Sequence, residues 1–263
     1  IVAKIIEAQP IAGSDHLTRT VVDDGTTQRT VVCGAPNARV GLRTALATPG
    51  THLPAIGMTV GTRAVMGVES DGMLCSAKEL GVYDDARGIV AYGSDVQPGQ
   101  ALDEAWTADT ILELELTPNR ADAFSLLGVA RDVAAKLGQS LLDPSETVPQ
   151  GDTNGDDGLT VDLTDLDGCP HLVLQRIDGV QVAPSPLWLQ RNLALLGLRP
   201  RNNVVDVTNY VTFALGQPSH AYDARVLTEG HLQVRRATPN ETVALLDGDT
   251  YELNERDLVI ATD

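Results

Sequence analysis

The first hundred residues alternate short apolar or β-branched runs with turn residues. Gly, Asn, Asp and Pro separate the runs, and they favour turns because Gly adopts positive φ and Asn or Asp bond their own backbone. Short strands at such close spacing predict a small β-barrel rather than a βαβ sheet. One short helix is predicted over residues 74–80, ended by Gly81. The predicted strands cover residues 19–22, 29–33, 44–47, 59–66 and 88–92.

The hydrophobic period changes after residue 110. Residues 111–116 alternate glutamates with apolar side chains, which predicts a half-buried strand. Apolar residues then recur at helical spacing over residues 123–137, after Asp122 as candidate N-cap and before Gly138. This segment is predicted to be an amphipathic helix.

The last hundred residues mix the two periods. A helix should follow Ser185 and Pro186, because proline is tolerated in the first turn, and its buried stripe is predicted at Leu189, Leu193 and Leu196. Thr208 is the predicted cap of a second helix, which runs to Leu215 and ends at Gly216. Strands are predicted at residues 171–177, 231–236, 242–246 and 257–261, with a hairpin turn at 247–249.

These patterns together predict a mixed β and α+β fold in four parts. They are a β-barrel over residues 1–108, a joining strand and helix over 109–142, an acidic linker over 143–158 and a mixed α/β domain over 159–263. The linker is inferred because residues 143–168 hold eight Asp and Glu and no Lys or Arg. A Ca²⁺ loop is the alternative for this stretch, but its acids lack the EF-hand register.

The net charge of the chain limits the kinds of partner that it can bind. The chain has 36 Asp and Glu against 19 Lys and Arg, a formal charge of −17, which argues against a uniformly positive nucleic-acid-binding surface. Any nucleic-acid binding must therefore be confined to a small part of the surface. Residues 171–225 carry five arginines against three aspartates, so much of the negative charge lies elsewhere.

Other sequence features point to a cytoplasmic fragment. No apolar run approaches the roughly 20 residues that cross a bilayer, and no signal-peptide pattern is present. The three cysteines are odd in number and lack C-x-x-C spacing, so free thiols in a reducing compartment are expected. The chain opens without Met in one apolar run and closes on another, which indicates a piece of a longer protein.

Common catalytic and nucleotide-binding signatures are missing from the sequence. It contains no P-loop, no dinucleotide-binding glycine motif, no H-E-x-x-H and no G-x-S-x-G. The five histidines are scattered along the chain. No metal site and no cofactor are therefore expected in this piece.

Two segments remain as candidates for function. The first joins Val32-Cys33-Gly34-Ala35-Pro36-Asn37 to residues 72–81, and the second runs over residues 199–211 and 216–223. The second is dense in Arg, Asn, Gln and His but is flanked by apolar runs. A buried polar group without a partner costs about 1–3 kcal/mol, so this cluster needs internal partners or a ligand.

Both segments resemble one family, the bacterial phenylalanyl-tRNA synthetase (phenylalanine–tRNA ligase) β subunits. The first resembles the family's tRNA-binding OB-fold and the second its editing domain, while Thr117-Pro118-Asn119-Arg120-Ala121-Asp122 and the helix before Gly138 resemble the segment between them. The three blocks occur in family order. The resemblance thus covers nearly the whole chain and makes the barrel an OB-fold and the last domain a truncated editing domain.

The resemblance implies a class II aminoacyl-tRNA synthetase of two α and two β subunits. In that family the α subunit uses ATP and Mg²⁺ to activate phenylalanine, so this fragment should not aminoacylate tRNA and should hold no cofactor. Its expected tasks are tRNA binding and a contribution to hydrolysis of tyrosine wrongly attached to the phenylalanine tRNA. Editing is needed because a pocket for an apolar side chain excludes an added hydroxyl only weakly, by roughly a hundredfold.

By position, the family's editing residues match Arg199, Asn209 and His220. The resemblance implies that Arg199 holds the tRNA terminus, that His220 orients the ester or the attacking water, and that Asn209 lines the pocket. A neutral histidine can also act as the base, so its role stays open. The family's remaining pocket residues, a Gly-rich segment and a Glu, lie beyond residue 263, so little or no hydrolysis by this fragment is expected.

Structural explanations compete for the same three residues. Asn209 fits a helix cap together with Thr208. His220 fits a turn after Pro218. Arg199 and Arg201 fit a helix C-terminus, where the helix dipole favours cations.

Contacts of the barrel with tRNA should be electrostatic. Its first hundred residues offer only Tyr83 and Tyr92 for base stacking. Residues 1–108 carry 12 acids against 8 Lys and Arg, which predicts weak binding unless the basic residues cluster. The candidates for backbone contacts are Lys4, Arg39, Arg43, Arg63, Lys78 and Arg87.

Two rival functions stay open. A non-enzymatic tRNA-binding and protein-interaction module predicts that the polar cluster from Arg199 to His220 is closed and self-paired, without a pocket. A free-standing hydrolase of mischarged tRNA predicts that the isolated chain deacylates tyrosyl-tRNA.

Overall fold

The computed structural model describes residues 1–105, 109–142, 158–245 and 248–262 and divides into two units. The first comprises Ile1–Leu141 and Val182–Ser219, and the second comprises Leu142–Gln181 and His220–Asp263. Most of the predicted linker, residues 143–157, and part of the predicted turn at 247–249 lie outside the described residues.

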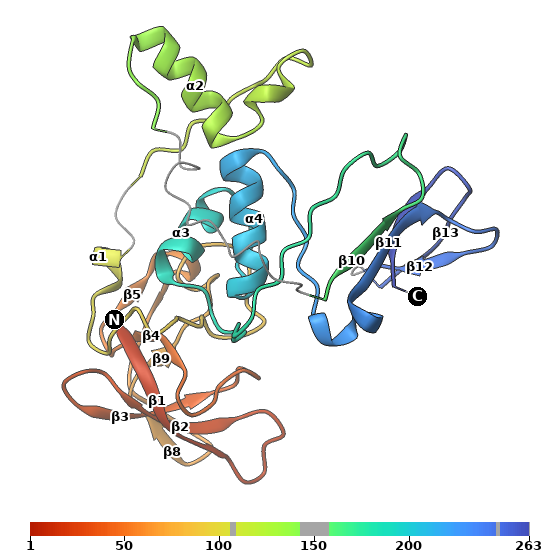
Figure 1. Cartoon of the computed structure of the whole chain (residues 1–263). Coiled ribbons are helices and arrows are strands. Elements are labelled where there is room, and N and C mark those ends of the chain that lie inside the picture. Colours follow the sequence, from red (N-terminus) through yellow and green to blue (C-terminus); the bar gives the residue numbers. More distant parts are fainter. Residues whose placement is uncertain (106–108, 143–157, 246–247, 263) are drawn as a thin grey trace. The chain divides into compact units, whose positions relative to one another are not determined.

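A five-stranded antiparallel sheet forms the barrel of the first unit (Figure 1). Strand β1 (Val2–Pro10) pairs with both β2 (Thr18–Asp23) and β4 (Arg43–Ala47), and a register shift between Ile5 and Glu7 bends it. The sheet curls nearly closed. The segment just before its last strand bonds to the strand at its other end, where the Asp71 N–H donates to the Thr30 carbonyl (2.8 Å) and the Val32 N–H to the Ser70 hydroxyl (3.0 Å). The strand order is β3 (Gln28–Cys33), β2 (Thr18–Asp23), β1 (Val2–Pro10), β4 (Arg43–Ala47) and β9 (Met73–Leu74).

This nearly closed sheet confirms the predicted OB-fold barrel. Its interior is apolar: Val2, Ile5, Val22 and Val31 are fully buried. Short paired strands extend the barrel, namely β5 (His52–Leu53) with β6 (Met58–Thr59) and β7 (Arg63–Val65) with β8 (Val68–Ser70), and the 3₁₀ turn η1 (Pro54–Ile56) separates β5 from β6.

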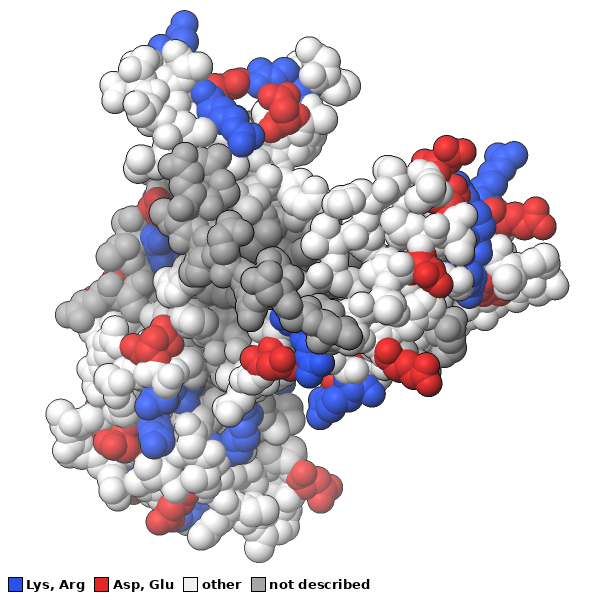
Figure 2. Space-filling model, viewed as in Figure 1, with Lys and Arg blue, Asp and Glu red and all other residues white. Residues whose placement is uncertain are grey.

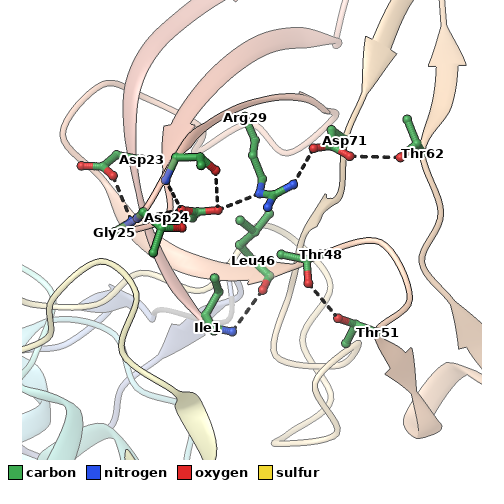
Figure 3. Close-up of polar contacts among 12 residues, drawn as sticks. Ile1, Asp23, Asp24, Gly25, Arg29, Leu46, Thr48, Thr51, Thr62 and Asp71 are labelled. Atoms are coloured by element: carbon green, nitrogen blue, oxygen red, sulfur yellow. Dashed lines mark hydrogen bonds and ion pairs between the residues drawn. The ribbon is translucent and has the colours of Figure 1, made fainter.

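A buried ionic network closes the β2–β3 hairpin (Figure 3). The Asp24 carboxylate is 2% exposed and accepts hydrogen bonds from the backbone N–H groups of Thr26 and Thr27 and from the guanidinium of Arg29 (2.7 Å). Arg29 also contacts Asp71 (2.6 Å), beyond β8. Arg29 thus links the β2–β3 turn to the residue that follows β8.

Three predictions for the barrel need correction. The predicted strand 59–66 is divided between β6 and β7. At 88–92 there is no strand, only a single bridge between Tyr92 and Arg43. The predicted helix at 74–80 is one turn, in which Ser76 and Glu79 bond each other's backbone N–H groups and Gly81 ends the turn at φ 72°.

The segment after the barrel contains the short helix α1 (Leu102–Ala105), the 3₁₀ turn η2 (Ala121–Ala123) and helix α2 (Leu126–Leu137). The amphipathic helix is confirmed, although Ser125 rather than Asp122 is its N-cap, and Gly138 ends it at φ 63° as expected. The strand predicted at 111–116 is wrong: these residues pair with no described strand, and Leu112 is 76% exposed.

Helices α3 (Leu187–Leu195) and α4 (Asn203–Leu215) complete the first unit and pack on each other. In α3, Leu189 and Leu193 are buried as predicted, but Leu196 lies past the helix end and is 40% exposed. The predicted cap of α4 is wrong. Its N-cap is Asn202, six residues before Thr208, and the Asn202 side chain accepts from the N–H groups of Val204 and Val205.

The second unit contains a three-stranded sheet and a hairpin (Figure 1). In the sheet, β11 (His231–Arg236) pairs parallel with β10 (Thr160–Leu163) and antiparallel with β14 (Leu258–Ala261). The hairpin joins β12 (Thr242–Ala244) to β13 (Thr250–Glu252), and the 3₁₀ turns η4 (Ala224–Val226) and η5 (Thr228–Gly230) precede β11. Strand β10 was not predicted, and the strand predicted at 171–177 is wrong, since no described strand pairs with it.

Candidate functional site

Helix α3 is fixed to the barrel at its N-terminus. Pro186 occupies the N-cap position but has no side-chain acceptor to offer, and the Asp95 carboxylate accepts from the Leu187 N–H instead (2.7 Å). One turn later the Gln190 amide donates to the carbonyl of Ala91 (3.0 Å). The Leu187 side chain lies in the same apolar cluster as Val2 and Tyr92. Residues about 90 positions apart in sequence therefore hold α3 against the barrel.

The loop after α3 carries Arg199 to the barrel. Its Nε contacts one carboxylate oxygen of Asp85 at 2.7 Å, and the Arg87 Nε contacts the other oxygen at 3.1 Å. The Arg199 Nη1 is buried and has no hydrogen-bond acceptor among the described residues. A buried donor without an acceptor costs about 1–3 kcal/mol, and more when it is charged. Asp85 therefore satisfies Arg199 only in part.

Asp206, in the first turn of α4, is fully buried. One of its oxygens accepts from the Ser185 hydroxyl (2.5 Å) and the other from the Arg201 N–H (2.8 Å). The Asp206 carboxylate thus joins the loop before α4 to Ser185, just before α3. The side chain of Arg201 is exposed and has no hydrogen bond or ion pair with a described residue.

These groups surround a cavity of about 340 Å³ within the first unit. One wall comes from barrel residues 37–39 and 83–91, and the other from residues 182–190 and 199–206. Arg39, Arg199 and Arg201 all line it, together with the ring of Tyr83. The volume lies in the range of small-molecule pockets, roughly 300–1,000 Å³. A second cavity, of about 570 Å³, contains Arg39 and Arg43 in its lining.

The three predicted editing residues are divided between the units. Arg199 lines the first cavity, and Asn209 lies half-buried in the middle of α4. The structural alternative for Asn209 is wrong, because Asn202 caps α4. His220 belongs to the second unit, where it is exposed and its ring centroid lies 6.4 Å from that of Tyr222.

The six predicted tRNA-binding residues do not form one cluster. Arg39 and Arg43 share the second cavity, whereas Lys78 pairs with Asp84 (2.8 Å) and Arg87 with Asp85 (3.1 Å). Lys4 is half-buried on β1 and Arg63 is exposed on β7. Figure 2 shows basic and acidic residues intermixed over the face that it presents.

Several residues of the cavity were missed by the sequence analysis. Asp85, Asp206 and Ser185 form its hydrogen-bonded wall, and Asp95 and Gln190 hold that wall in place. Their partners lie up to about a hundred positions away in sequence. Two of them carried a signal: Ser185 precedes a helix-opening proline, and Asp206 lies within the candidate segment 199–211.

The three cysteines are free thiols. Cys33 and Cys75 are buried in the barrel, and burial raises the pKa of both, that of Cys75 to about 12. Cys75 is thus protonated at neutral pH and a poor nucleophile.

Within the described part of the chain, no three His, Cys, Asp or Glu side chains converge as metal ligands. Over the same residues, none of the helices is both long and apolar enough to cross a membrane.

Two family models match the chain in succession. The model described as a putative tRNA binding domain matches residues 1–101, and that of the B3/4 domain matches residues 168–263. The first coincides with the barrel. The second begins before α3 and includes the arginine-bearing wall of the cavity.

Relatives match the chain over its full length. The phenylalanine–tRNA ligase beta subunit of Rhodopseudomonas palustris is 43% identical over 266 residues, which cover 100% of this chain and 33% of that protein. The corresponding subunit of Bradyrhizobium diazoefficiens is 42% identical, with 99% and 32% coverage, and that of Moorella thermoacetica is 43% identical, with 99% and 33%.

The chain spans about a third of the length of the curated relatives it matches. The order of the two matched domains agrees with the order of the two candidate segments in the sequence. The chain therefore belongs to the phenylalanine–tRNA ligase beta subunit family.

Proposed function

We propose that this chain is the part of a phenylalanine–tRNA ligase beta subunit that binds tRNA and contributes residues to the hydrolysis of mischarged tyrosyl-tRNA. The whole enzyme would join phenylalanine to its tRNA with ATP and Mg²⁺ and would contain α and β subunits as an (αβ)₂ heterotetramer. ATP and Mg²⁺ would be held by the α subunit. The observation that carries the proposal is the arginine-lined cavity beside a barrel that matches a tRNA-binding family.

Each editing residue has a separate proposed task. Arg199, whose guanidinium is only partly satisfied by Asp85, would hold a phosphate of the tRNA terminus. His220 would orient the ester or the attacking water, and Asn209 would line the pocket for the tyrosine side chain. A neutral imidazole has one ring nitrogen that donates a hydrogen bond and one that accepts, which suits either role of His220.

A titration of tRNA tests the binding function. Binding through backbone contacts should weaken steeply between 50 and 200 mM salt, since each neutralised phosphate releases counterions. Undetectable binding at about 50 mM salt, or affinity that does not change with salt, would contradict backbone binding.

Deacylation of tyrosyl-tRNA tests the editing function. We expect little or no hydrolysis by the 263-residue chain and hydrolysis by the full-length enzyme that falls in the His220→Ala variant. Equal hydrolysis by the wild-type and variant enzymes would exclude His220. Robust hydrolysis by the short chain would instead support a free-standing hydrolase.

A non-enzymatic tRNA-binding and protein-interaction module is the second candidate. The pairing of Arg199 with Asp85 and the closed contacts of Asp206 favour it, because part of the polar cluster is self-paired. The open cavity beside the same residues counts against it. Normal hydrolysis by full-length enzymes with Arg199→Ala or His220→Ala would support this module.

A further inference from the structure

The cavity of the first unit brings three arginines together from two distant parts of the sequence. Arg39 comes from the barrel, and Arg199 and Arg201 come from the loop between α3 and α4. Like charges repel at close range, so such a grouping is unfavourable unless anions offset it. The charges of the lining residues therefore decide what the cavity can bind.

The two carboxylates in the lining are already engaged. Asp85 contacts Arg199 through one oxygen and Arg87 through the other. Asp206 is fully buried, and its oxygens accept from Ser185 and from the Arg201 backbone N–H. Neither carboxylate contacts the guanidinium of Arg201 or of Arg39, so both arginines keep their charge available.

The arginines themselves have donors to spare. The Arg201 guanidinium has no partner among the described residues, and Arg39 makes one long bond (3.3 Å) to the Asn37 carbonyl. Asp85 contacts Arg199 at Nε, and the buried Nη1 has no acceptor in the described structure. Rotation of this guanidinium toward an oxyanion in the cavity would satisfy that donor.

We propose that this cavity is a phosphate-binding site in which Arg39, Arg199 and Arg201 hold the phosphate group and Asp85 positions Arg199. A phosphate offers oxygens in several directions and can accept from more than one guanidinium, each of which presents paired N–H groups. The site unites the barrel with the α3–α4 loop, so one phosphate would bridge the residues of two matched domains.

A phosphate group bound in this cavity can come from two sources. A backbone phosphate of tRNA is the source that rests on the proposed function, whereas a mononucleotide or inorganic phosphate does not. Tyr83 lines the same cavity and offers an aromatic ring to a nucleoside next to the phosphate.

The test compares the 263-residue chain with Arg39→Ala, Arg201→Ala and the double variant. Arg39 and Arg201 are exposed, so these substitutions should leave the fold intact, which circular dichroism can check. Arg19→Ala is the matched control: it removes one charge from the barrel, outside the cavity lining. Each cavity variant should weaken tRNA binding about tenfold and lower the salt slope by about one, while the control changes little.

A second measurement observes Arg199 directly. The NMR signal of its Nε–H group, assigned by its loss in Arg199→Lys, should shift when inorganic phosphate, AMP or tRNA is added. The shift should be weaker in the Arg39→Ala and Arg201→Ala double variant. Asp85→Asn should move the signal before any ligand is added, because it removes the partner of Nε.

The outcomes separate this site from the proposed function. One outcome combines three results: tRNA binds, the cavity variants behave like Arg19→Ala, and phosphate leaves the Arg199 signal unchanged. The phosphate site is then refuted, but tRNA binding stands. If inorganic phosphate or AMP shifts the signal and tRNA does not bind, the site stands with a free phosphate ligand and the proposed function fails. If none of the three probes binds, both proposals are wrong.

Discussion

The two units differ in how much apolar surface each buries. In the first unit the sheet curls nearly closed, and its strands contribute fully buried residues such as Val2, Ile5, Val22 and Val31. Among the described residues of the second unit, the buried apolar side chains are Leu232, Val234 and Ala237, all on or next to β11. A sheet needs a second layer or closure on itself to bury its faces. The barrel has closure, whereas the three-stranded sheet leaves Leu258 and Ile260 about 40% exposed.

The difference teaches where a rigid site can be built. Of the cavity arginines, Arg39 belongs to the nearly closed barrel, and Arg199 and Arg201 lie in the loop that follows α3, a helix fixed to that barrel. His220 lies in the unit with the smaller core. Stability measurements on single residues can test this contrast.

The largest effect is expected from truncation in the barrel core. Ile5→Ala should lower the free energy of unfolding by about 2–5 kcal/mol, because it leaves a cavity at a fully buried position. Leu258→Ala in β14 is the matched control and should cost less than about 1 kcal/mol, since its side chain is 39% exposed. Urea unfolding measures both. Equal losses would show that the second unit is as well packed as the barrel.

The next effect concerns the buried carboxylate of the barrel. Asp24→Asn should cost about 1–3 kcal/mol at pH 7, because it weakens bonds from Thr26, Thr27 and Arg29. Burial raises the pKa of Asp24, but these donors outweigh it and hold the pKa well below its usual value.

The same carboxylate predicts a pH dependence with a definite sign. Because its pKa is lower in the folded than in the unfolded chain, Asp24 stabilises the fold above pH about 4, and the contribution is lost as pH falls toward the folded pKa. The stability difference between the wild-type chain and Asp24→Asn should therefore shrink below pH about 4 in urea unfolding. A difference that stays constant down to pH 2 would contradict this account.

A smaller effect is expected where α3 meets the barrel. Asp95→Ala removes the acceptor of the Leu187 N–H and should cost about 1 kcal/mol, the usual cost of losing an N-cap. Hydrogen exchange of the first α3 amides should accelerate, while exchange in β1 and β2 stays unchanged. Ser94→Ala, at the exposed neighbouring position, is the control and should leave the exchange of α3 unaltered.

The smallest effect is predicted in the second unit. Arg235 bonds both carboxylate oxygens of Glu241 (2.8 and 3.0 Å) and, with the Thr238 N–H, lowers the pKa of Glu241 to about 2. Because both side chains are about a quarter exposed, Glu241→Gln should lower the stability of the second unit only slightly at pH 7. The loss should vanish as pH falls from 4.5 toward 2. Glu252→Gln, on exposed β13, is the control and should have no effect.

The elements best predicted from the sequence were those whose periodicity or end signals are local. The strands that contain Arg19 and Arg29 lie where short apolar runs are bounded by turn residues, and α2 ends at Gly138 through a positive φ, as its sequence pattern implied. The wrong predictions concern segments whose secondary structure depends on a neighbouring strand. Residues 111–116 have a strand pattern but no neighbouring strand, and β10 becomes a strand because β11 lies beside it.

The candidate site could be predicted by residue type but not by its contacts. Arg199 and Arg39 were both identified from the sequence, but nothing local indicated that they line one cavity. Asp85 and Asp95 looked like ordinary loop aspartates. Their roles depend on α3 and its following loop returning to the barrel, which is a long-range event that periodicity does not encode.

The capping of α3 by Asp95 has a practical consequence for dissecting the chain. A polypeptide cut at the family boundary, residue 168, would carry α3 without its acceptor at the N-terminus and without the apolar neighbours of Leu187. Arg199 would also lose its only ion-pair partner in the described structure. A barrel that ends at residue 101 would expose the surface where Leu187 packs. Fragments cut at the family boundaries are therefore expected to be less stable than the same residues in the intact chain.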